Sequence, residues 1–243
     1  VSGGYEFTGK DPLLQDRFYQ NDGTGKFTRR DLTPEFLSGS CVANFDFEGD
    51  GDQDLFVGTR IIPGSYPTPP DHLLLINDGQ GNFKQYTFPY SPGMISDAAV
   101  ADLNGDKLDD LVLAGEWTSI QVYINEKGSF SDVSSDWAPN TSGWWNTLIL
   151  NDFDGDGDLD AFAGEANGNT FFFRNTGNAS APAQPQRLSY IEGFGSPASI
   201  WAATDVDQVL CNAPNWGWYS NLPKRPSHGA TWNRVYWDWH VEL

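Results

Sequence analysis

A stretch of nine residues, 152–160, alternates carboxylates with glycine or apolar residues in the order Asp-Phe-Asp-Gly-Asp-Gly-Asp-Leu-Asp. Five carboxylates this close repel one another unless a cation lies among them. Gly155 and Gly157 allow the chain to curl so that the oxygens converge. Ca²⁺ takes about six to eight hard oxygen ligands at roughly 2.3–2.6 Å. The stretch therefore predicts a calcium-binding loop.

The elements around this loop are strands, and the loop recurs along the chain. Short apolar segments, 147–150 and 161–164, flank it and are typical of β-strands. Related loops occupy residues 46–54 and 102–110, and a broken copy begins at Asp205. The four starts are 56, 50 and 53 residues apart, which indicates a structural repeat.

A second motif, an Asn-containing turn between two apolar runs, repeats out of phase with the acidic loops. Asn-Asp-Gly in this context is a strong hairpin signal, because Asn and Gly tolerate the positive φ that such turns need. The five occurrences begin at Asn21, Asn77, Asn125, Asn175 and Asn221.

The two motifs together define a unit of four strands in about 50 residues. We name its strands a to d, with the acidic loop between a and b and the Asn turn between c and d. One such sheet cannot bury both faces, whereas sheets stacked around an axis can, which favours a β-propeller. A parallel β-helix has much shorter repeats. EF-hands need a ligand at position twelve and flanking helices, neither of which is found here.

The predicted fold is all-β: one propeller domain over residues 1–243 with four-stranded blades, about four to five of them in this chain. An additional c–d hairpin at residues 15–34 has no a–b partner; it either completes a shared blade when a ring closes or belongs to a longer propeller. The proline-rich segment 61–70 is expected to project as a surface loop. The predicted blades span residues 38–90, 95–137, 144–190 and 197–238.

The composition excludes several classes of partner. A formal charge of −19 argues against binding nucleic acid or docking on anionic membranes. No apolar run approaches the roughly 20 residues that span a bilayer. No signal peptide is visible at Val1, so we expect a mature chain or an excised piece. Cys41 and Cys211 either pair in an oxidising compartment or remain buried thiols.

The acidic loops and the strands that follow them resemble the FG-GAP/VCBS repeat propellers, as in integrin α-subunits. Within that group the chain is most similar to secreted bacterial and cartilage acidic protein-like members, which often carry an ASPIC/UnbV module. The resemblance covers residues 15–190 and includes the strands after each loop, the turns at Asn21 and Asn77 and the segment 143–146. It implies a ring that often has seven blades.

The resemblance also implies a ligand set for about three Ca²⁺ ions, namely the side chains at loop positions one, three, five and nine and the carbonyl of position seven. Glu48 departs from the family pattern, because Glu is one methylene longer than Asp or Asn. The broken copy at Asp205 lacks positions five and nine, so no Ca²⁺ is expected there. The implied ligands are Asp46, Glu48, Asp50, Asp52 and Asp54; Asp102, Asn104, Asp106, Leu108 and Asp110; and Asp152, Asp154, Asp156, Asp158 and Asp160.

Other chemistry is less well supported by the residues. A catalytic carboxylate pair would suit one reaction centre, whereas three similar clusters suit architecture. His72, His228 and His240 lack zinc-ligand spacing, and no catalytic elbow or phosphate-binding loop is present, so no catalytic residue is assigned. Trp117, Trp144 and Trp145 are candidate ligand residues, as stacking platforms for sugar rings or as core. Trp144 and Trp145 are adjacent, so on a strand they face opposite sides.

These observations predict a secreted or cell-surface calcium-binding propeller that is not an enzyme and that recognises an extracellular protein or a glycan through adhesion- or lectin-like contacts. The alternative is a carbohydrate-active enzyme, a polysaccharide lyase or glycoside hydrolase, with its site in the propeller channel.

Overall fold

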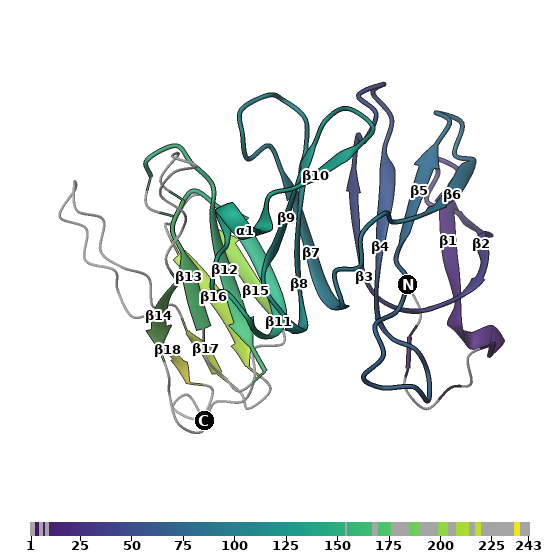
Figure 1. The fold of residues 1–243 in the computed structure, drawn as a ribbon. Helices are drawn as coiled ribbons and strands as arrows, with labels where there is room; N and C mark the ends of the chain where they lie inside the picture. Colours follow the sequence, from purple (N-terminus) through teal and green to yellow (C-terminus); the bar gives the residue numbers. More distant parts are fainter. Residues whose placement is uncertain are drawn as a thin grey trace.

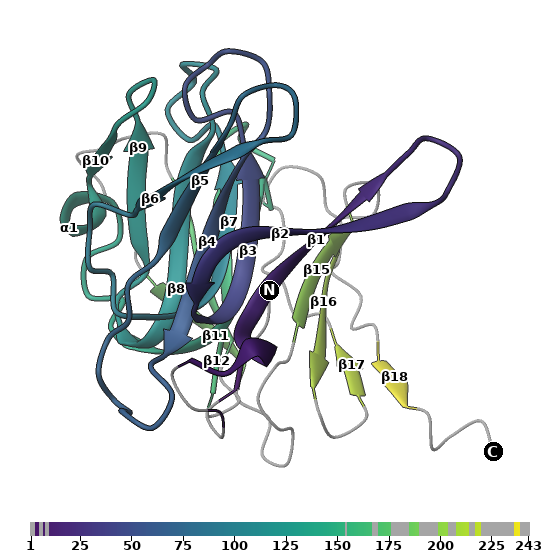
Figure 2. The same cartoon turned by 90° about the vertical axis from the view of Figure 1, so that its right-hand side faces the viewer.

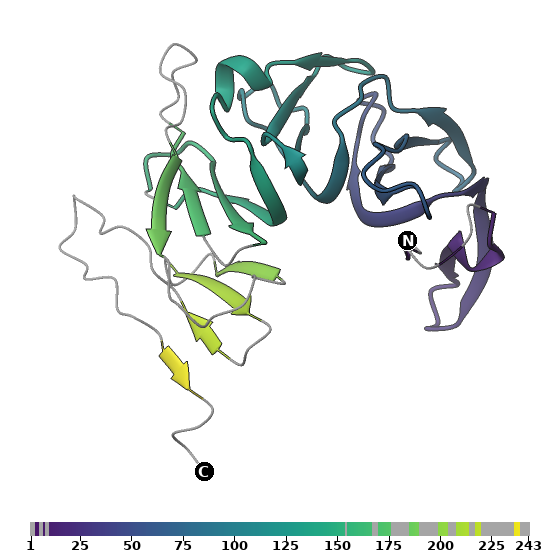
Figure 3. The ribbon, with the colours of Figure 1, turned by 60° about the horizontal axis from the view of Figure 1, so that its bottom comes forward.

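The fold is known from a computed structural model, and it consists almost entirely of antiparallel β-strands. The structure describes residues 3–4, 7, 10–153, 155–166 and 170–175, and the backbone of five strands between residues 185 and 238. Four blades of four strands follow one another around an arc (Figures 1 and 3), which confirms the predicted propeller architecture.

Each blade uses consecutive strands in sequence order. Blade 1 contains β3 (Ser38–Phe45), β4 (Asp54–Ile61), β5 (Leu73–Asn77) and β6 (Phe83–Thr87). Blade 2 contains β7 (Met94–Ala101), β8 (Asp110–Thr118), β9 (Gln121–Asn125) and β10 (Phe130–Asp132). Blade 3 contains β11 (Gly143–Asn151), β12 (Asp160–Glu165), β13 (Thr170–Phe173) and β14 (Pro185–Ser189). Blade 4 contains β15 (Ser199–Ala203), β16 (Gln208–Ala213), β17 (Gly217–Tyr219) and β18 (Tyr236–Asp238).

The N-terminal hairpin precedes blade 1 and packs against it. It consists of β1 (Gln15–Asn21) and β2 (Phe27–Phe36), after the short 3-10 turn Pro12–Leu14, and it extends from the side of the arc (Figure 2). Phe18 meets Phe83 edge to face with ring centroids 5.9 Å apart. Arg30 also donates from Nη2 to Oδ1 of Asn82 at 3.2 Å.

The acidic loops have the same place in the register of three blades. In each blade the last residue of strand a pairs with an aspartate that begins strand b: Phe45 with Asp54, Ala101 with Asp110, and Asn151 with Asp160. Strands a and c both run toward the loop end, so the c–d turns lie at the same end as the acidic loops (Figure 1).

The core lies between neighbouring blades. Between blades 1 and 2, Phe45, Phe56, Phe88, Tyr123 and Phe130 form one buried cluster. Their rings meet edge to face or tilted, and each such pair adds about 0.5–1.5 kcal/mol beyond burial of area. A second cluster, which includes Val112, Leu148 and Phe173, joins blades 2 and 3.

The first strands of blades 1 to 3 pack side by side and are joined by side-chain hydrogen bonds. Ser40 on β3 donates from Oγ to the carbonyl of Ile95 on β7 at 2.6 Å. One blade further, Ser96 makes the same bond to the carbonyl of Trp145 on β11, also at 2.6 Å. Asp97 then accepts from the backbone N–H of Leu148 at 2.8 Å. The same hydrogen bond therefore connects blade 1 to blade 2 and blade 2 to blade 3.

Blades 2 and 3 are also continuous through their backbones. The end of β8 pairs with the start of β11, with Gly143 opposite Thr118 and Trp144 opposite Glu116. A single turn of helix, α1 (Ser134–Trp137), precedes this junction. None of the helices in the described residues is long and apolar enough to span a membrane.

Candidate functional site

The three acidic loops share one hydrogen-bonding scaffold, built first on the aspartate at position one. Its carboxylate accepts backbone N–H groups from positions four to six, so the chain curls around it. In blade 1, Asp46 accepts from Asp50 N at 3.0 Å and from Gly51 N at 2.9 Å. In blade 2, Asp102 accepts from the N–H groups of Gly105, Asp106 and Lys107. In blade 3, Asp152 accepts from those of Gly155 and Gly157.

Position five continues the curl with a local turn. Its carboxylate accepts from the N–H of position seven in every loop: Asp50 from Asp52 at 3.2 Å, Asp106 from Leu108 at 2.8 Å, and Asp156 from Asp158 at 3.1 Å. Positions four and six have φ values between 69° and 99° in all three loops. The repeated sequence therefore folds into a repeated loop conformation.

Position nine has a different environment, because its carboxylate is fully buried. Each of its two oxygens accepts a backbone N–H, one from loop position two and one from the Asn that begins the c–d turn. We call this arrangement the position-nine clasp. The N···O distances are 2.7–3.1 Å. The carboxylates, each buried, and the residues whose backbone N–H groups donate to them are Asp54 with Phe47 and Asn77, Asp110 with Leu103 and Asn125, and Asp160 with Phe153 and Asn175.

The clasp joins the two sequence motifs that sequence analysis had recognised separately. The Asn of the turn also bonds back toward the loop: Asn77 Nδ2 donates to the carbonyl of Gln53 at 3.2 Å, and Asn125 Nδ2 to that of Asp109 at 3.3 Å. Its Oδ1 accepts from a turn glycine, Gly81 or Gly128. The acidic loop and the c–d turn therefore form one unit.

The loops hold negative charge that their own hydrogen bonds do not offset. Burial, and then the neighbouring aspartates, raises the pKa of Glu48 and of Asp52. Burial also raises the pKa of Asp54 and of Asp110, although both accept amide N–H groups. Asp109 has a raised pKa for the same reason, with a smaller contribution from Asp102 and from Asp46 of the neighbouring blade.

The donor set fits Ca²⁺, since every candidate ligand atom is a hard oxygen and the loops hold many more carboxylates than basic side chains. The residues that would hold the ion are the predicted sets at positions one, three, five, seven and nine. Within the described ranges, no three His, Cys, Asp or Glu side chains lie together in the arrangement of a formed metal centre. Asp154 and the broken copy at Asp205 lie outside the described residues.

Two basic side chains lie close to the loops. Arg174 pairs with Asp156 at 3.4 Å, and both side chains are partly exposed. The aliphatic part of Lys127, on the c–d turn of blade 2, lies beside Gly49 in the loop of blade 1. The same turn donates from Gly128 N to the carbonyl of Phe47 at 2.9 Å. Neighbouring blades therefore meet at the loop end.

A second candidate site is a cavity of about 920 Å³ at the opposite end of the blades, where strands a begin and strands b end. We call it the Glu116 cavity. Its lining comes from the first three blades and from residues 3–4. Its lining includes the polar and aromatic residues Ser40, Arg60, Tyr66, Ser96, Glu116 and Trp144.

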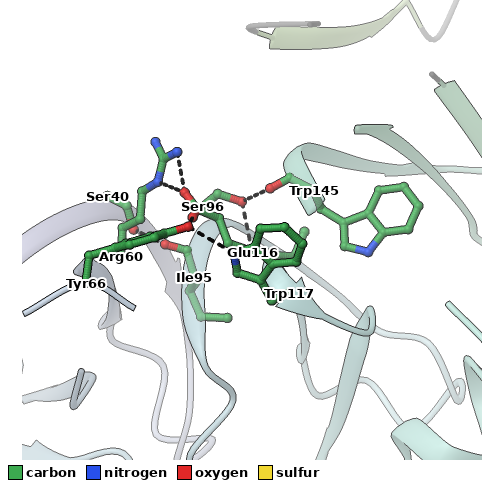
Figure 4. A network of polar contacts seen from close by, with 9 residues as sticks. Ser40, Arg60, Tyr66, Ile95, Ser96, Glu116, Trp117 and Trp145 are labelled. Atoms are coloured by element: carbon green, nitrogen blue, oxygen red, sulfur yellow. Dashed lines mark hydrogen bonds and ion pairs between the residues drawn. The ribbon is translucent and has the colours of Figure 1, made fainter. Parts of the chain in front are cut away.

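Glu116 is the charged centre of this cavity, and its carboxylate is held at both oxygens. It is only 3% exposed. The guanidinium of Arg60 pairs with Oε1, and the hydroxyl of Tyr66 donates to Oε2 at 3.2 Å (Figure 4). Tyr66 in turn accepts from Nε1 of Trp117 at 2.9 Å. The buried Glu116 carboxylate is therefore linked to a half-exposed guanidinium and, through the Tyr66 hydroxyl, to the exposed indole of Trp117.

Trp117 has an unusual backbone conformation. Gly143 pairs with Thr118 and Trp144 with Glu116, so Trp117 is the extra residue of a β-bulge at the β8–β11 junction. Its φ is 57°, in the left-handed region, which costs a residue with a Cβ about 1–2 kcal/mol. The bulge turns the indole outward, where it is 65% exposed and tilted against Trp144 with ring centroids 4.9 Å apart.

The three candidate tryptophans have different places. Trp144 lines the cavity and Trp117 packs against Trp144 from outside the lining, and we call these two residues the tryptophan platform. Trp145 is 2% exposed and packs edge to face on Phe171 and Phe173, with its Nε1 donating to the carbonyl of Thr141. A Cβ at position 143 would lie only 2.7 Å from the Trp145 ring. Glycine at position 143 is therefore required for the Trp145 ring to pack where it does.

The roles of Arg60, Tyr66 and Glu116 could not be predicted from the sequence, because Arg60 and Tyr66 lie 56 and 50 residues from Glu116 and the three share no motif. The proline-rich segment 61–70 does not simply project, since it returns Tyr66 to Glu116. Cys41 is a free thiol, and the side chain of Cys211 lies outside the described residues.

Comparison with known proteins places the acidic loops in a recognised family. Residues 46–113 and 102–163 match the FG-GAP-like repeat family in two adjacent repeats. No curated protein matches the chain. This part of the chain therefore consists of FG-GAP-like repeats, which confirms the resemblance found in the sequence.

Solved structures share the fold only loosely. The structure of BBS1N in complex with ARL6DN, soaked with lead, is 14% identical with a TM-score of 0.46, and the match covers 74% of this chain and 52% of that one. A lectin of Agrocybe aegerita that recognises non-reducing terminal N-acetylglucosamine is 20% identical with a TM-score of 0.41, and the match covers 71% and 46%. The chain thus spans about half the length of these structures.

Proposed function

We propose that this chain, whose residues 46–163 form FG-GAP-like repeats, is a calcium-binding β-propeller that recognises an extracellular protein or carbohydrate. It acts without catalysis, as a secreted or cell-surface module. The observation that carries this proposal is the common scaffold of the three acidic loops, in which the carboxylate of position one accepts the N–H of position six in every loop.

The proposed role of Ca²⁺ is to stabilise the loop end of the blades. The ion would supply positive charge among carboxylates whose pKa values burial and mutual repulsion already raise. The residues of the chain contribute the rest: position one curls the loop, position five fixes its second turn, and position nine attaches it to the c–d turn. Extracellular calcium modules bind with a Kd of about 10⁻⁴–10⁻³ M, which suits an ion that is abundant outside cells.

The division of the molecule supports recognition as the function. The acidic loops occupy one end of the blades and serve the architecture, whereas the Glu116 cavity and the tryptophan platform lie at the other end. Exposed aromatic side chains beside a cavity that holds convergent polar groups are typical of binding sites. The adhesion or recognition surface is therefore assigned to the end away from the acidic loops.

A glycoside hydrolase, one of the two enzymes considered as the alternative function, typically uses two carboxylates roughly 5–9.5 Å apart across the scissile bond. Among the described residues that line the cavity, Glu116 is the one carboxylate. Arg60 and Tyr66 already hold both of its oxygens. This arrangement favours binding over hydrolysis.

The experiment that tests the proposal measures thermal unfolding and calcium binding together. Calcium at about ten times its Kd stabilises the folded state by about 1.4 kcal/mol for each site. For a chain of this size each kcal/mol raises Tm by about 2–4 °C. We expect a Tm higher by several degrees in calcium than in EGTA, and about three bound ions by equilibrium dialysis. Magnesium at the same concentration should have a smaller effect.

Single variants at position one serve as matched controls. Asp46→Asn, Asp102→Asn and Asp152→Asn should each remove about one bound ion and leave the other two. A Tm that is the same in calcium and in EGTA would contradict the proposal, as would a stoichiometry unaffected by all three variants.

A further inference from the structure

The tryptophan platform and the Glu116 cavity together resemble a binding site for a ligand from outside the chain. Trp117 is held in a left-handed bulge that points its indole outward, and 65% of the side chain is exposed. Burial of the Trp117 indole would be favourable, whereas the left-handed bulge keeps the ring at the surface. Bulges that re-aim a side chain and strained residues of this kind concentrate at functional sites.

A second observation points to a ligand independently of Trp117. Nε1 of Trp144 is buried and has no hydrogen-bond acceptor. Trp144 lines the cavity, and its backbone pairs with that of Glu116. Buried indole N–H groups normally find an acceptor. The site thus contains a donor that its own side chains do not satisfy.

The polar groups of the cavity are fixed in place before any ligand arrives. Arg60 and Tyr66 hold the Glu116 carboxylate, while Ser40 and Ser96 donate to carbonyls of the neighbouring blades. A second lone pair remains on each serine oxygen, and nearly half of the Arg60 side chain is exposed. The site therefore offers donors and acceptors at defined positions beside a flat aromatic surface.

We propose that this site binds a neutral saccharide, with a pyranose ring lying on the indole of Trp117 and hydroxyl groups reaching the Arg60–Glu116 pair. This inference rests on the proposed recognition function and names its ligand class. A sugar ring matches the site because it carries an apolar C–H face and a rim of hydroxyls that both donate and accept. The lining mixes polar and apolar groups in the same way.

The charge of the chain argues for a neutral rather than an anionic sugar. The net charge of −19 repels polyanions such as polymers of uronic acids. Arg60, the cation of the cavity, is already paired with Glu116. Since the same pairing neutralises Glu116, the site also lacks the free anion that would attract a cationic ligand.

The test is a binding measurement in calcium with oligosaccharides of neutral hexoses and N-acetylhexosamines, and in parallel with uronic acid oligosaccharides. Binding is followed by tryptophan fluorescence and by isothermal titration calorimetry. We expect at least one neutral oligosaccharide to bind with a change in indole emission. Trp117→Gly should weaken that binding at least tenfold without lowering Tm, because glycine accepts the left-handed φ without strain.

Tyr86→Ala is the matched control, since Tyr86 is also an exposed aromatic residue but lies on the outer strand of blade 1. It should leave binding unchanged. The proposal is overturned if no neutral oligosaccharide binds, if only uronic acid oligosaccharides bind, or if Trp117→Gly binds as well as the natural chain. If calcium raises Tm and no sugar binds, the ligand class alone is wrong. If calcium has no effect, the proposed function itself has failed.

Discussion

Loop position six has the left-handed conformation in all three acidic loops, but the residue there differs. It is Gly51 in blade 1 and Gly157 in blade 3, with φ of 96° and 99°, whereas blade 2 has Lys107 at 73°. No atom lies within 4 Å of a Cβ built at either glycine. The cost of a side chain at this position is therefore purely one of backbone conformation.

Lys107→Gly should stabilise the protein by about 0.5–1 kcal/mol, because the relief of the left-handed strain exceeds the entropy that glycine loses on folding. Urea unfolding in EGTA gives the free energy of unfolding. Lys107→Gln is the control, since it removes the charge and keeps the Cβ, and it should not stabilise by this amount. Gly157→Ala should destabilise by about 1 kcal/mol. A less stable Lys107→Gly variant would contradict the strain argument.

His72 is a buried histidine with a defined hydrogen-bonding pattern. It is 1% exposed and stacks on Phe56. Nδ1 accepts from Thr59 N at 3.1 Å, so the proton is on Nε2, which donates to the carbonyl of Gly93 at 3.0 Å. Burial lowers the pKa of His72 to about 4, although the Gly93 carbonyl and Asp71 act in the opposite direction.

This low pKa predicts a loss of stability in acid. The unfolded chain takes up the His72 proton near pH 6.5 and the folded chain only near pH 4, so stability falls as pH decreases through that window. The slope is about 1.4 kcal/mol per pH unit, or about 2 kcal/mol between pH 7 and pH 5. His72→Gln keeps one acceptor and one donor and cannot titrate, so its urea unfolding should lose about 2 kcal/mol less over the same range. Equal losses in both proteins would exclude His72 as the cause.

At the scale of elements, the position-nine clasp explains why two motifs repeat together although they are separated in sequence. The aspartate that begins strand b bonds to the acidic loop with one oxygen and to the c–d turn with the other. Both amides are then satisfied within the blade. The clasp is complete in this structure, so this carboxylate has a structural role that does not depend on an ion.

Asp110→Asn should destabilise blade 2 by about 2–3 kcal/mol in EGTA, because an amide NH₂ faces a backbone N–H where an acceptor is needed. Asp109→Asn is the matched control, since the neighbouring carboxylate is not part of a clasp, and it should cost less than about 0.5 kcal/mol. The measurement is urea unfolding followed by circular dichroism. If Asp110→Asn destabilises in calcium but not in EGTA, the carboxylate acts through the ion alone.

At the scale of the whole molecule, the blades are joined by three kinds of contact. Aromatic clusters fill the space between neighbouring sheets, while Ser40, Ser96 and Asp97 tie the first strands of successive blades. At the β8–β11 junction, strands of blade 2 and blade 3 also pair through their backbones. The Glu116 cavity lies where these contacts meet, so its walls belong to several blades.

The repeat pattern in the sequence was enough to predict the architecture. Acidic loops such as 46–54 and Asn turns such as that at Asn77 are local signals, in which the residues that interact are close in sequence. The propeller and its four-stranded blades are confirmed. The calcium sites and the role of the tryptophans as ligand residues stay predictions, supported by the shared loop scaffold and by the position of Trp117 beside Trp144.

The sequence by itself determined the repeat, the strand order within a blade and the acidic loops, because each depends on periodicity and turn chemistry over about ten residues. Only the tertiary structure decided that Asp54, Asp110 and Asp160 are buried clasps and that Trp144 faces a cavity while Trp145 fills the core. It also brought together Arg60, Tyr66 and Glu116. Such contacts depend on how the blades stack. Residues that meet only across blades, such as Arg60 and Glu116, belong to no motif that the sequence shows.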